Sequence, residues 1–78
     1  MLEVKNDETE LFSNGLRFST GADVEMDLVE AHKWFNLAAL KGNMEARDRR
    51  RELAEVMTEM QISAAQKAAR DWLNRASN

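Results

Sequence analysis

The feature that most limits the fold is an apolar stripe in residues 27–43, which read DLVEAHKWFNLAALKGN. Small and aromatic side chains recur there three and four positions apart, which is the spacing of one face of an α-helix. They are Leu28, Ala31, Trp34, Phe35, Ala38 and Ala39. Alanines at such positions let a neighbouring helix approach closely, and the two aromatic rings fill the space beside that contact. The stripe therefore predicts a helix packed against other helices in a core.

Helix start signals recur along the rest of the chain. Asp7, Asp27 and Thr58 each stand three residues before a Glu or a Gln, which is the spacing of a capping box. Asn43 is a fourth candidate N-cap. The first two helices should end at glycines that take the left-handed cap conformation. The signals predict helices over about 8–20, 28–41, 44–57 and 59–76.

The last two predicted helices carry inward positions at the same spacing. For 44–57 we expect Ala46, Leu53, Val56 and Met57 to face inward, and for 59–76 Ile62, Ala65, Ala68, Ala69, Trp72, Leu73 and Ala76. Connections are short, so consecutive helices should pack antiparallel, as helical hairpins. The chain has 78 residues, three glycines, no proline and no cysteine. This length and composition predict one small all-α domain without disulfides.

One pattern runs through the first half of the chain: Gly15-x-x-Phe18-x-x-Gly21-x-x-Val24-x-x-Asp27-x-x-x-Ala31-x-x-Trp34-Phe35-x-x-Ala38-Ala39-x-x-Gly42. It resembles the Sel-one-like repeat, a branch of the tetratricopeptide-repeat superfamily, and the string LVEAHKWFNLAALKGN is close to bacterial members. The resemblance implies an α-solenoid of two stacked antiparallel helical hairpins. It places one repeat at about 8–42 and a degenerate capping helix pair at about 43–76, within a single domain spanning 1–78.

Two positions depart from the pattern of that family. Asn14 stands where leucine usually precedes the glycine, and Asp23 stands where a second loop glycine is usual. Aspartate tolerates left-handed backbone better than most residues, so we expect Asp23 to preserve the shape of the loop.

Residues typical of catalysis are sparse. His32 is the single histidine, and nothing in the sequence brings one of the four serines to it; we expect it to be a partly exposed neighbour of the core. Asp27, Glu30 and His32 match no familiar metal-ligand spacing. The three glycines are too scattered for a phosphate-binding loop. We therefore expect no enzymatic activity, no cofactor and no metal.

The strongest charged feature is RDRRR, residues 47–51. It has two interpretations: a patch for an acidic partner, a phosphate or RNA, or a solvated helix face whose arginines pair with nearby Glu and Asp. The chain as a whole has a net charge of −3, with −4 in residues 1–42 and +1 in residues 43–78. This composition disfavours nucleic-acid binding, which usually requires a strongly basic domain.

The resemblance implies a protein–protein interaction module, a small adaptor or scaffold without catalytic activity. Helix pairs of that family present a concave surface lined mainly by the first helix of each pair. The polar, outward residues on those helices are Ser13, Arg17, Arg47, Arg50 and Arg51. We predict that they contact a protein or peptide partner that carries acidic groups.

Two other functions follow from other observations. Val29, Leu37 and Leu40 lie away from the main stripe, so the helix they share is apolar nearly all round. Such a helix is either a buried central helix or a self-association surface of a structural or regulatory homo-oligomer. The chain is alternatively an inhibitor that binds a larger protein. The absence of cysteine, of a signal-peptide pattern and of a long apolar run predicts a cytoplasmic protein without a membrane anchor.

Overall fold

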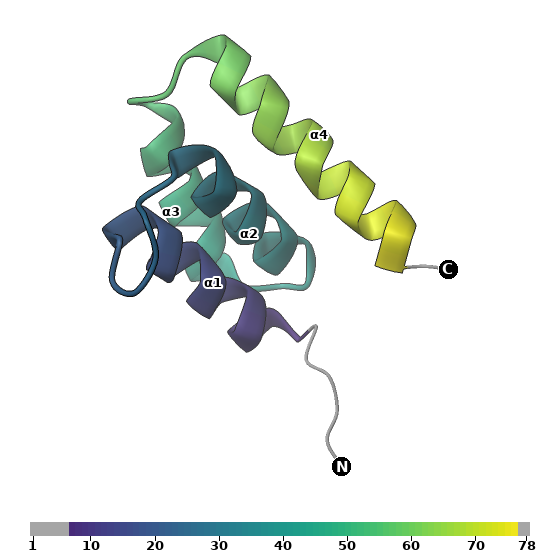
Figure 1. Cartoon of the computed structure of the whole chain (residues 1–78). Helices are drawn as coiled ribbons and strands as arrows, with labels where there is room; N and C mark the ends of the chain where they lie inside the picture. Colours follow the sequence, from purple (N-terminus) through teal and green to yellow (C-terminus); the bar gives the residue numbers. More distant parts are fainter. Residues whose placement is uncertain (1–6, 77–78) are drawn as a thin grey trace.

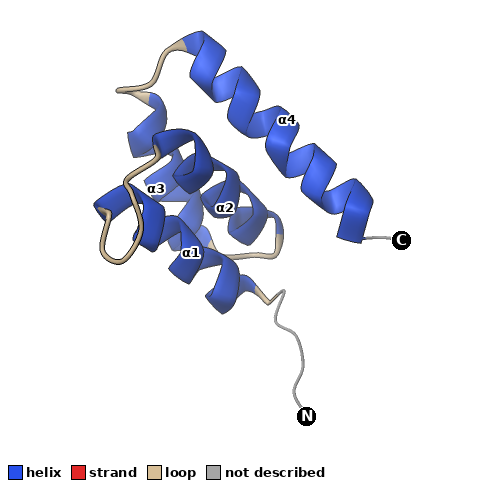
Figure 2. Ribbon diagram, viewed as in Figure 1, coloured by secondary structure: helices blue, strands red, loops and turns tan. Residues whose placement is uncertain are grey.

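The structure is a computed structural model that describes residues 7–76, with residue 76 described by its backbone alone. Within that range the chain forms helices and no strands, so the predicted all-α fold is confirmed (Figure 2). The helices are α1 (Glu8–Thr20), α2 (Leu28–Leu40), α3 (Met44–Ala54) and α4 (Glu59–Ala76). No helix in the described range is long and apolar enough to cross a membrane. The predicted domain, 1–78, includes residues 1–6 and 77–78, which lie outside the described residues.

The helices begin where the capping signals predicted. The side chains of Asp7, Asp27 and Asn43 each accept a hydrogen bond from the backbone N–H three residues later, at 2.9, 3.1 and 2.8 Å. Before α4 the capping box is complete, because Thr58 and Gln61 each bond the backbone N–H of the other at 3.0 and 2.9 Å. These bonds satisfy donors that the first helical turn leaves without partners.

Glycines close the first two helices as predicted. Gly21 has φ 70° after α1, and Gly42 has φ 104° after α2. After α2 the N–H of Gly42 donates to the carbonyl of Ala39 at 3.0 Å, and the N–H of Asn43 donates to the carbonyl of Ala38 at 3.1 Å. This pair of bonds is the Schellman motif, which requires a left-handed residue at the position of Gly42.

The left-handed backbone considered for Asp23 is not found in the structure. No described residue other than glycine has a positive φ, so Asp23 does not adopt the left-handed conformation. Its carboxylate instead accepts a hydrogen bond from Nε of Arg17 at 2.9 Å. The aspartate therefore holds the α1–α2 loop through its side chain, where a glycine would act through its backbone.

Helix α2 is the centre of the structure. It packs against α1, α3 and α4, whereas α3 and α4 make few direct contacts with each other. Consecutive helices run in roughly opposite directions, as the predicted hairpins require, and α4 lies beside α2 (Figure 1). Because α2 touches all of its neighbours, it must be apolar on several faces.

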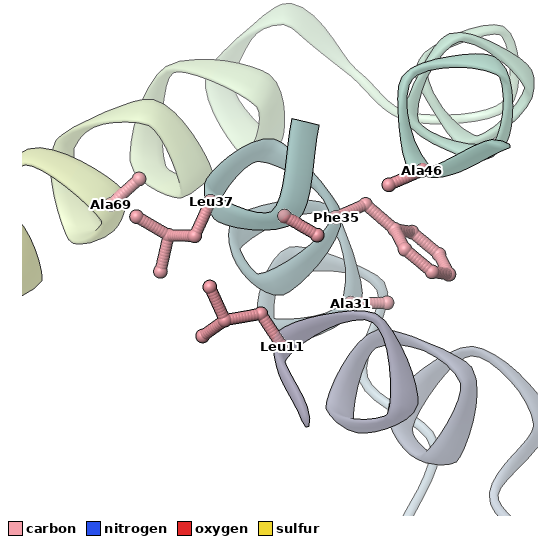
Figure 3. Close-up of a cluster of buried hydrophobic side chains, with 7 residues drawn as sticks. Leu11, Ala31, Phe35, Leu37, Ala46 and Ala69 are labelled. Atoms are coloured by element: carbon pink, nitrogen blue, oxygen red, sulfur yellow. The ribbon is translucent and has the colours of Figure 1, made fainter. Parts of the chain in front are cut away.

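The buried side chains of α2 project to different sides of the helix. Phe35 points toward Ala46 of α3, while Leu37 points toward Ala69 of α4 and Leu11 of α1 (Figure 3). Phe35, Leu11 and Leu37 are the largest fully buried side chains of the described residues. The alanines opposite them are small enough for the neighbouring helices to come close.

The predicted self-association surface is therefore wrong in one of its three residues. Leu37 is only 1% exposed, because α4 and α1 cover it. Val29 is half-buried and Leu40 is exposed. The alternative interpretation, a buried central helix, describes α2 correctly.

The corner between α3 and α4 differs from the sequence expectation. Helix α3 ends at Ala54 instead of near Met57, and a turn of i to i+3 backbone bonds follows it. Met57 is buried as predicted, but Val56 is 72% exposed and Leu73 is also exposed. The chain turns away at this corner because α4 packs on α2, so Val56 has no helix opposite it. The side chain of Ala76, which we also expected to face inward, lies outside the described side chains.

At Gly15 the backbone of α1 closely approaches the ring of Phe35 in α2. A Cβ atom added there would lie 2.5 Å from two ring carbons of Phe35, well inside contact distance. Phe12 of α1 packs against the same ring, with 5.6 Å between ring centroids. A side chain at Gly15 would thus force Phe35 or α1 to move.

The substitution Gly15→Ala should therefore destabilise the protein. Overpacking of a tight contact costs about 1–3 kcal/mol, which outweighs the helix-propensity gain of about 1 kcal/mol that alanine brings. Urea unfolding followed by circular dichroism measures the difference. Ser13→Ala, on the exposed side of the same helix, is the matched control and should change stability by less than about 0.5 kcal/mol. A Gly15→Ala variant as stable as this control would contradict the contact.

Candidate binding site

A pocket of about 360 Å³ lies among α2, α3 and α4. It exists because α3 and α4 both pack on α2 but make few contacts with each other. The residues that line it are His32 and Asn36 of α2, Arg50, Arg51 and Ala54 of α3, and Ile62 and Gln66 of α4. The volume suits a group the size of a side chain or a small organic acid.

Two arginines give the pocket a positive charge. Arg50 donates from Nη1 to Oδ1 of Asn36, which holds its guanidinium against α2. Arg51 lies 3.8 Å from the carboxylate of Asp48, too far for a hydrogen bond, and its side chain is largely exposed. Among the described residues, no carboxylate lines the pocket. The pocket therefore holds more hydrogen-bond donors than acceptors and is cationic.

His32 is buried, which corrects the expectation of partial exposure. It is 3% exposed, and its Nδ1 atom is buried without a hydrogen-bond partner. Burial, and secondly the positive charge of Arg50, lower the pKa of His32 from its ordinary value of 6.5. A weaker interaction with its own backbone opposes this shift without giving Nδ1 a hydrogen bond of good geometry. An unpaired buried polar atom of this kind costs about 1–3 kcal/mol of stability.

A second pocket, of about 270 Å³, lies among α1, α2 and α3. It is lined by Ser19 and Thr20 of α1, Phe35 of α2, and Arg49, Glu52 and Leu53 of α3. The hydroxyls of Ser19 and Thr20 both donate to the carbonyl of Leu16, at 3.1 and 2.9 Å. The pocket contains charges of both signs, so it has less capacity to attract a charged ligand than the pocket of Arg50 and Arg51.

The structure brings together two of the five residues predicted to contact a partner. Arg50 and Arg51 line the pocket of α2, α3 and α4. Arg17 is bound to Asp23 at 2.9 Å and to Asn14 at 3.2 Å. Ser13 is exposed on α1, and Arg47 is exposed on α3. None of the five lines the pocket between α1 and α3, the two helices on which the concave surface was expected.

Sequence reasoning missed the contributions of α2 and α4 to the site. His32 and Asn36 stand four residues apart and so share one face of α2. That spacing of two polar residues in a mostly apolar helix was a usable signal. Ile62 and Gln66 of α4 have the same spacing. Nothing in the sequence indicated that the two pairs would line one pocket together with residues of α3.

Comparison of the chain with models of protein families, with curated proteins and with solved structures finds no match in any of the three.

Burial of His32 makes stability dependent on pH in a defined direction. The folded-state pKa lies below the unfolded value of about 6.5, so the unfolded chain binds more protons. Stability is therefore retained above pH 6.5 and falls as the pH drops from there toward the folded-state pKa. Between pH 7.5 and 5.5 the free energy of unfolding should therefore fall.

Urea unfolding at pH 7.5, 6.5 and 5.5 measures this loss, and the matched variant is His32→Leu. It removes both the titrating group and the unpaired nitrogen, so its stability should vary less across this range and should equal or exceed that of the wild type at pH 7.5. Parallel pH dependence of the two proteins would show that His32 is not held neutral by its surroundings.

Proposed function

We propose that the protein is a non-catalytic binding module for a protein or peptide that carries acidic side chains. The observation that carries this proposal is the pocket lined by Arg50 and Arg51 without a carboxylate. Arginine presents several N–H donors in a planar fork, which matches a carboxylate. The apolar side chains of Ala54 and Ile62 offer contact surface beside these charges.

The arginines of α3 form only weak ion pairs in the free protein, so they are available to bind a carboxylate of a partner. The Arg51–Asp48 pair is long and exposed, and such a pair contributes about 0–1 kcal/mol. The Arg49–Glu45 pair, at 3.5 Å, is also exposed. Arg47 has no ion pair with a described residue. A partner carboxylate would thus displace little when it approaches α3, and the unpaired charge would speed the encounter.

The absence of catalysis is part of the proposal. His32 lines the pocket, but among the residues that the structure describes no serine, aspartate or glutamate lines it beside the imidazole. Those are the partners on which nucleophilic or acid–base chemistry at a histidine would rely. The arrangement supports binding through donors and contact surface instead.

Membership of the Sel-one-like repeat family also remains a proposal, and it rests on the sequence pattern. That family would account for antiparallel hairpins and for a role as an adaptor or scaffold. We place the protein in the cytoplasm on the basis of its lack of cysteine. An inhibitor of a larger protein would use the same site, since it too would act by binding.

Self-association is the second candidate function, favoured by exposed apolar side chains at both ends of α3. Leu40 and Met44 lie exposed around the α2–α3 turn, and Val56 and Met60 lie exposed around the α3–α4 turn. Met60 is 82% exposed, an unusual position for a large apolar side chain. Light scattering across a range of concentrations would detect the oligomer.

Selection from a displayed peptide library tests the main proposal. The wild type should enrich peptides that contain Asp or Glu, and a synthetic version of an enriched peptide should bind in a fluorescence anisotropy titration. Arg51→Glu reverses a charge at the pocket and should weaken that binding by about tenfold or more. The side chain of Arg51 is exposed, so the substitution should leave the helical circular dichroism spectrum unchanged.

Arg75→Glu is the matched control, because it makes the same charge change on an exposed position near the end of α4, outside the pocket. It should retain most of the peptide affinity. Equal losses in the two variants would mean that net charge alone drives binding. A failure to enrich acidic peptides would contradict the proposed function.

A further inference from the structure

His32 is a buried polar residue with an unpaired nitrogen, which packing of the core alone does not explain. Its imidazole is almost fully buried, and Nδ1 has no hydrogen-bond partner. Native proteins pair nearly all buried polar atoms, so an unpaired one marks a place where stability is sacrificed. The ring belongs to the lining of the pocket that also contains Arg50 and Arg51.

The other residues of the pocket indicate which kind of ligand it would bind. Arg50 uses Nη1 on Asn36, which leaves most of its five donors free. Arg51 makes no hydrogen bond to its nearest carboxylate, which lies 3.8 Å away. The donors of the pocket thus outnumber its acceptors, which are the amide oxygens of Asn36 and Gln66. A carboxylate supplies two further oxygens with the planar geometry of the guanidinium group.

The apolar part of the pocket restricts the ligand further. Ala54 and Ile62 contribute aliphatic carbon to a space of about 360 Å³. A bare inorganic anion would leave that carbon without contacts, whereas a short methylene stem would cover it. The methylenes of a glutamyl side chain or of a small dicarboxylic acid fit this description.

We infer that the pocket among α2, α3 and α4 is a binding site for a carboxylate on a short aliphatic stem, held by Arg50, Arg51 and His32. The inference rests on the proposed function in one respect, since a partner's glutamate would be one source of the carboxylate. The other source is a free dicarboxylic acid. In both cases the arginines bind the oxygens, and the His32 ring lies beside the ligand as part of the pocket wall.

Binding should draw a proton to His32. The charged residues that line the pocket, Arg50 and Arg51, both come from α3. The lining residues of α4 are the neutral Ile62 and Gln66, and α2 contributes Asn36 beside His32. No described residue of α1 lines the pocket. The neighbouring Lys33 on α2 is paired with Glu30 at 3.1 Å. Burial is the main cause that lowers the pKa of His32, and the charge of Arg50 is the second. A bound carboxylate offsets the charge of Arg50, so the pKa should rise in the complex.

The single histidine makes this site directly observable, because the imidazole proton signals in an NMR spectrum come from His32 alone. The full-length wild type is titrated at pH 6.5 with glutarate, with inorganic phosphate, and with a blocked peptide that contains one Glu. A peptide with Gln in place of that Glu is the matched control. Glutarate, the Glu peptide or both should shift the His32 signals to saturation, and phosphate and the Gln peptide should bind at least about tenfold more weakly.

Two variants connect the signal to the proposed contacts. Arg51→Leu keeps the aliphatic bulk of an exposed position and should weaken the binding by about ten- to a hundredfold. His32→Leu should also lose the affinity, measured by calorimetry because its reporter is gone, while Arg75→Glu should keep it. If His32→Leu does not fold, Arg51→Leu and the wild-type His32 signals still decide the question.

Each result separates the inference from the proposed function. A shift caused by glutarate but not by the Glu peptide identifies a free acid as the ligand; the reverse identifies a partner's side chain. If an acidic peptide binds while neither it nor glutarate moves the His32 signals, the inference is overturned and the proposed function stands. If glutarate binds but the protein selects no acidic peptide, the proposed function is contradicted and the inference stands. Phosphate binding as tight as that of glutarate would overturn the requirement for an aliphatic carboxylate.

Discussion

The contact between Gly15 of α1 and the ring of Phe35 of α2 positions the rest of the structure. With no side chain at Gly15, the ring lies against the backbone of α1 and fills the space between α1 and α3. The same ring faces Ala46, so one side chain determines how two helices approach α2. A small protein has few such contacts, and the loss of one affects a large share of its stability.

Helix α4 joins this centre from the other side of α2. Leu37 faces Ala69, and Trp34 meets Trp72 edge to face, with ring centroids 5.9 Å apart. Trp34 is only partly buried. Its indole N–H donates to Glu30 at 3.1 Å, and the amine of Lys33 lies 4.2 Å from its ring centroid. The contacts of α4 with α2 hold it away from α3, and the basic pocket is the space that results.

At His32 the residue that lines the pocket is not the residue that would make the core most stable. A leucine at that position would leave no unpaired nitrogen and would not titrate, so the core itself does not require a histidine there. The imidazole and the two arginines instead line one open pocket. Proteins often sacrifice stability at sites that bind or react, where local rules of packing and pairing are broken for another purpose.

Capping and glycine signals predicted the helices well because they act within a few residues. Asp27 caps α2 through a bond to its own first turn, and Gly42 closes it through the backbone of the preceding turn. Both interactions are encoded locally, and neither depends on what packs against the helix. The exception is the end of α3, where Val56 fits the helical spacing but faces solvent. The tertiary packing, and not the local sequence, decides which helix lies opposite that position.

By itself the sequence determined that the chain is all-helical, where its helices begin and that α2 is its most apolar helix. Only the tertiary structure decided which sides of α2 are covered, and so buried Leu37 and placed His32 in a pocket with Arg50 and Arg51. The physical reason is that helical periodicity gives the angle of a side chain around its own axis. It does not give the direction from which a neighbouring helix arrives, and a site built from three helices depends on that direction.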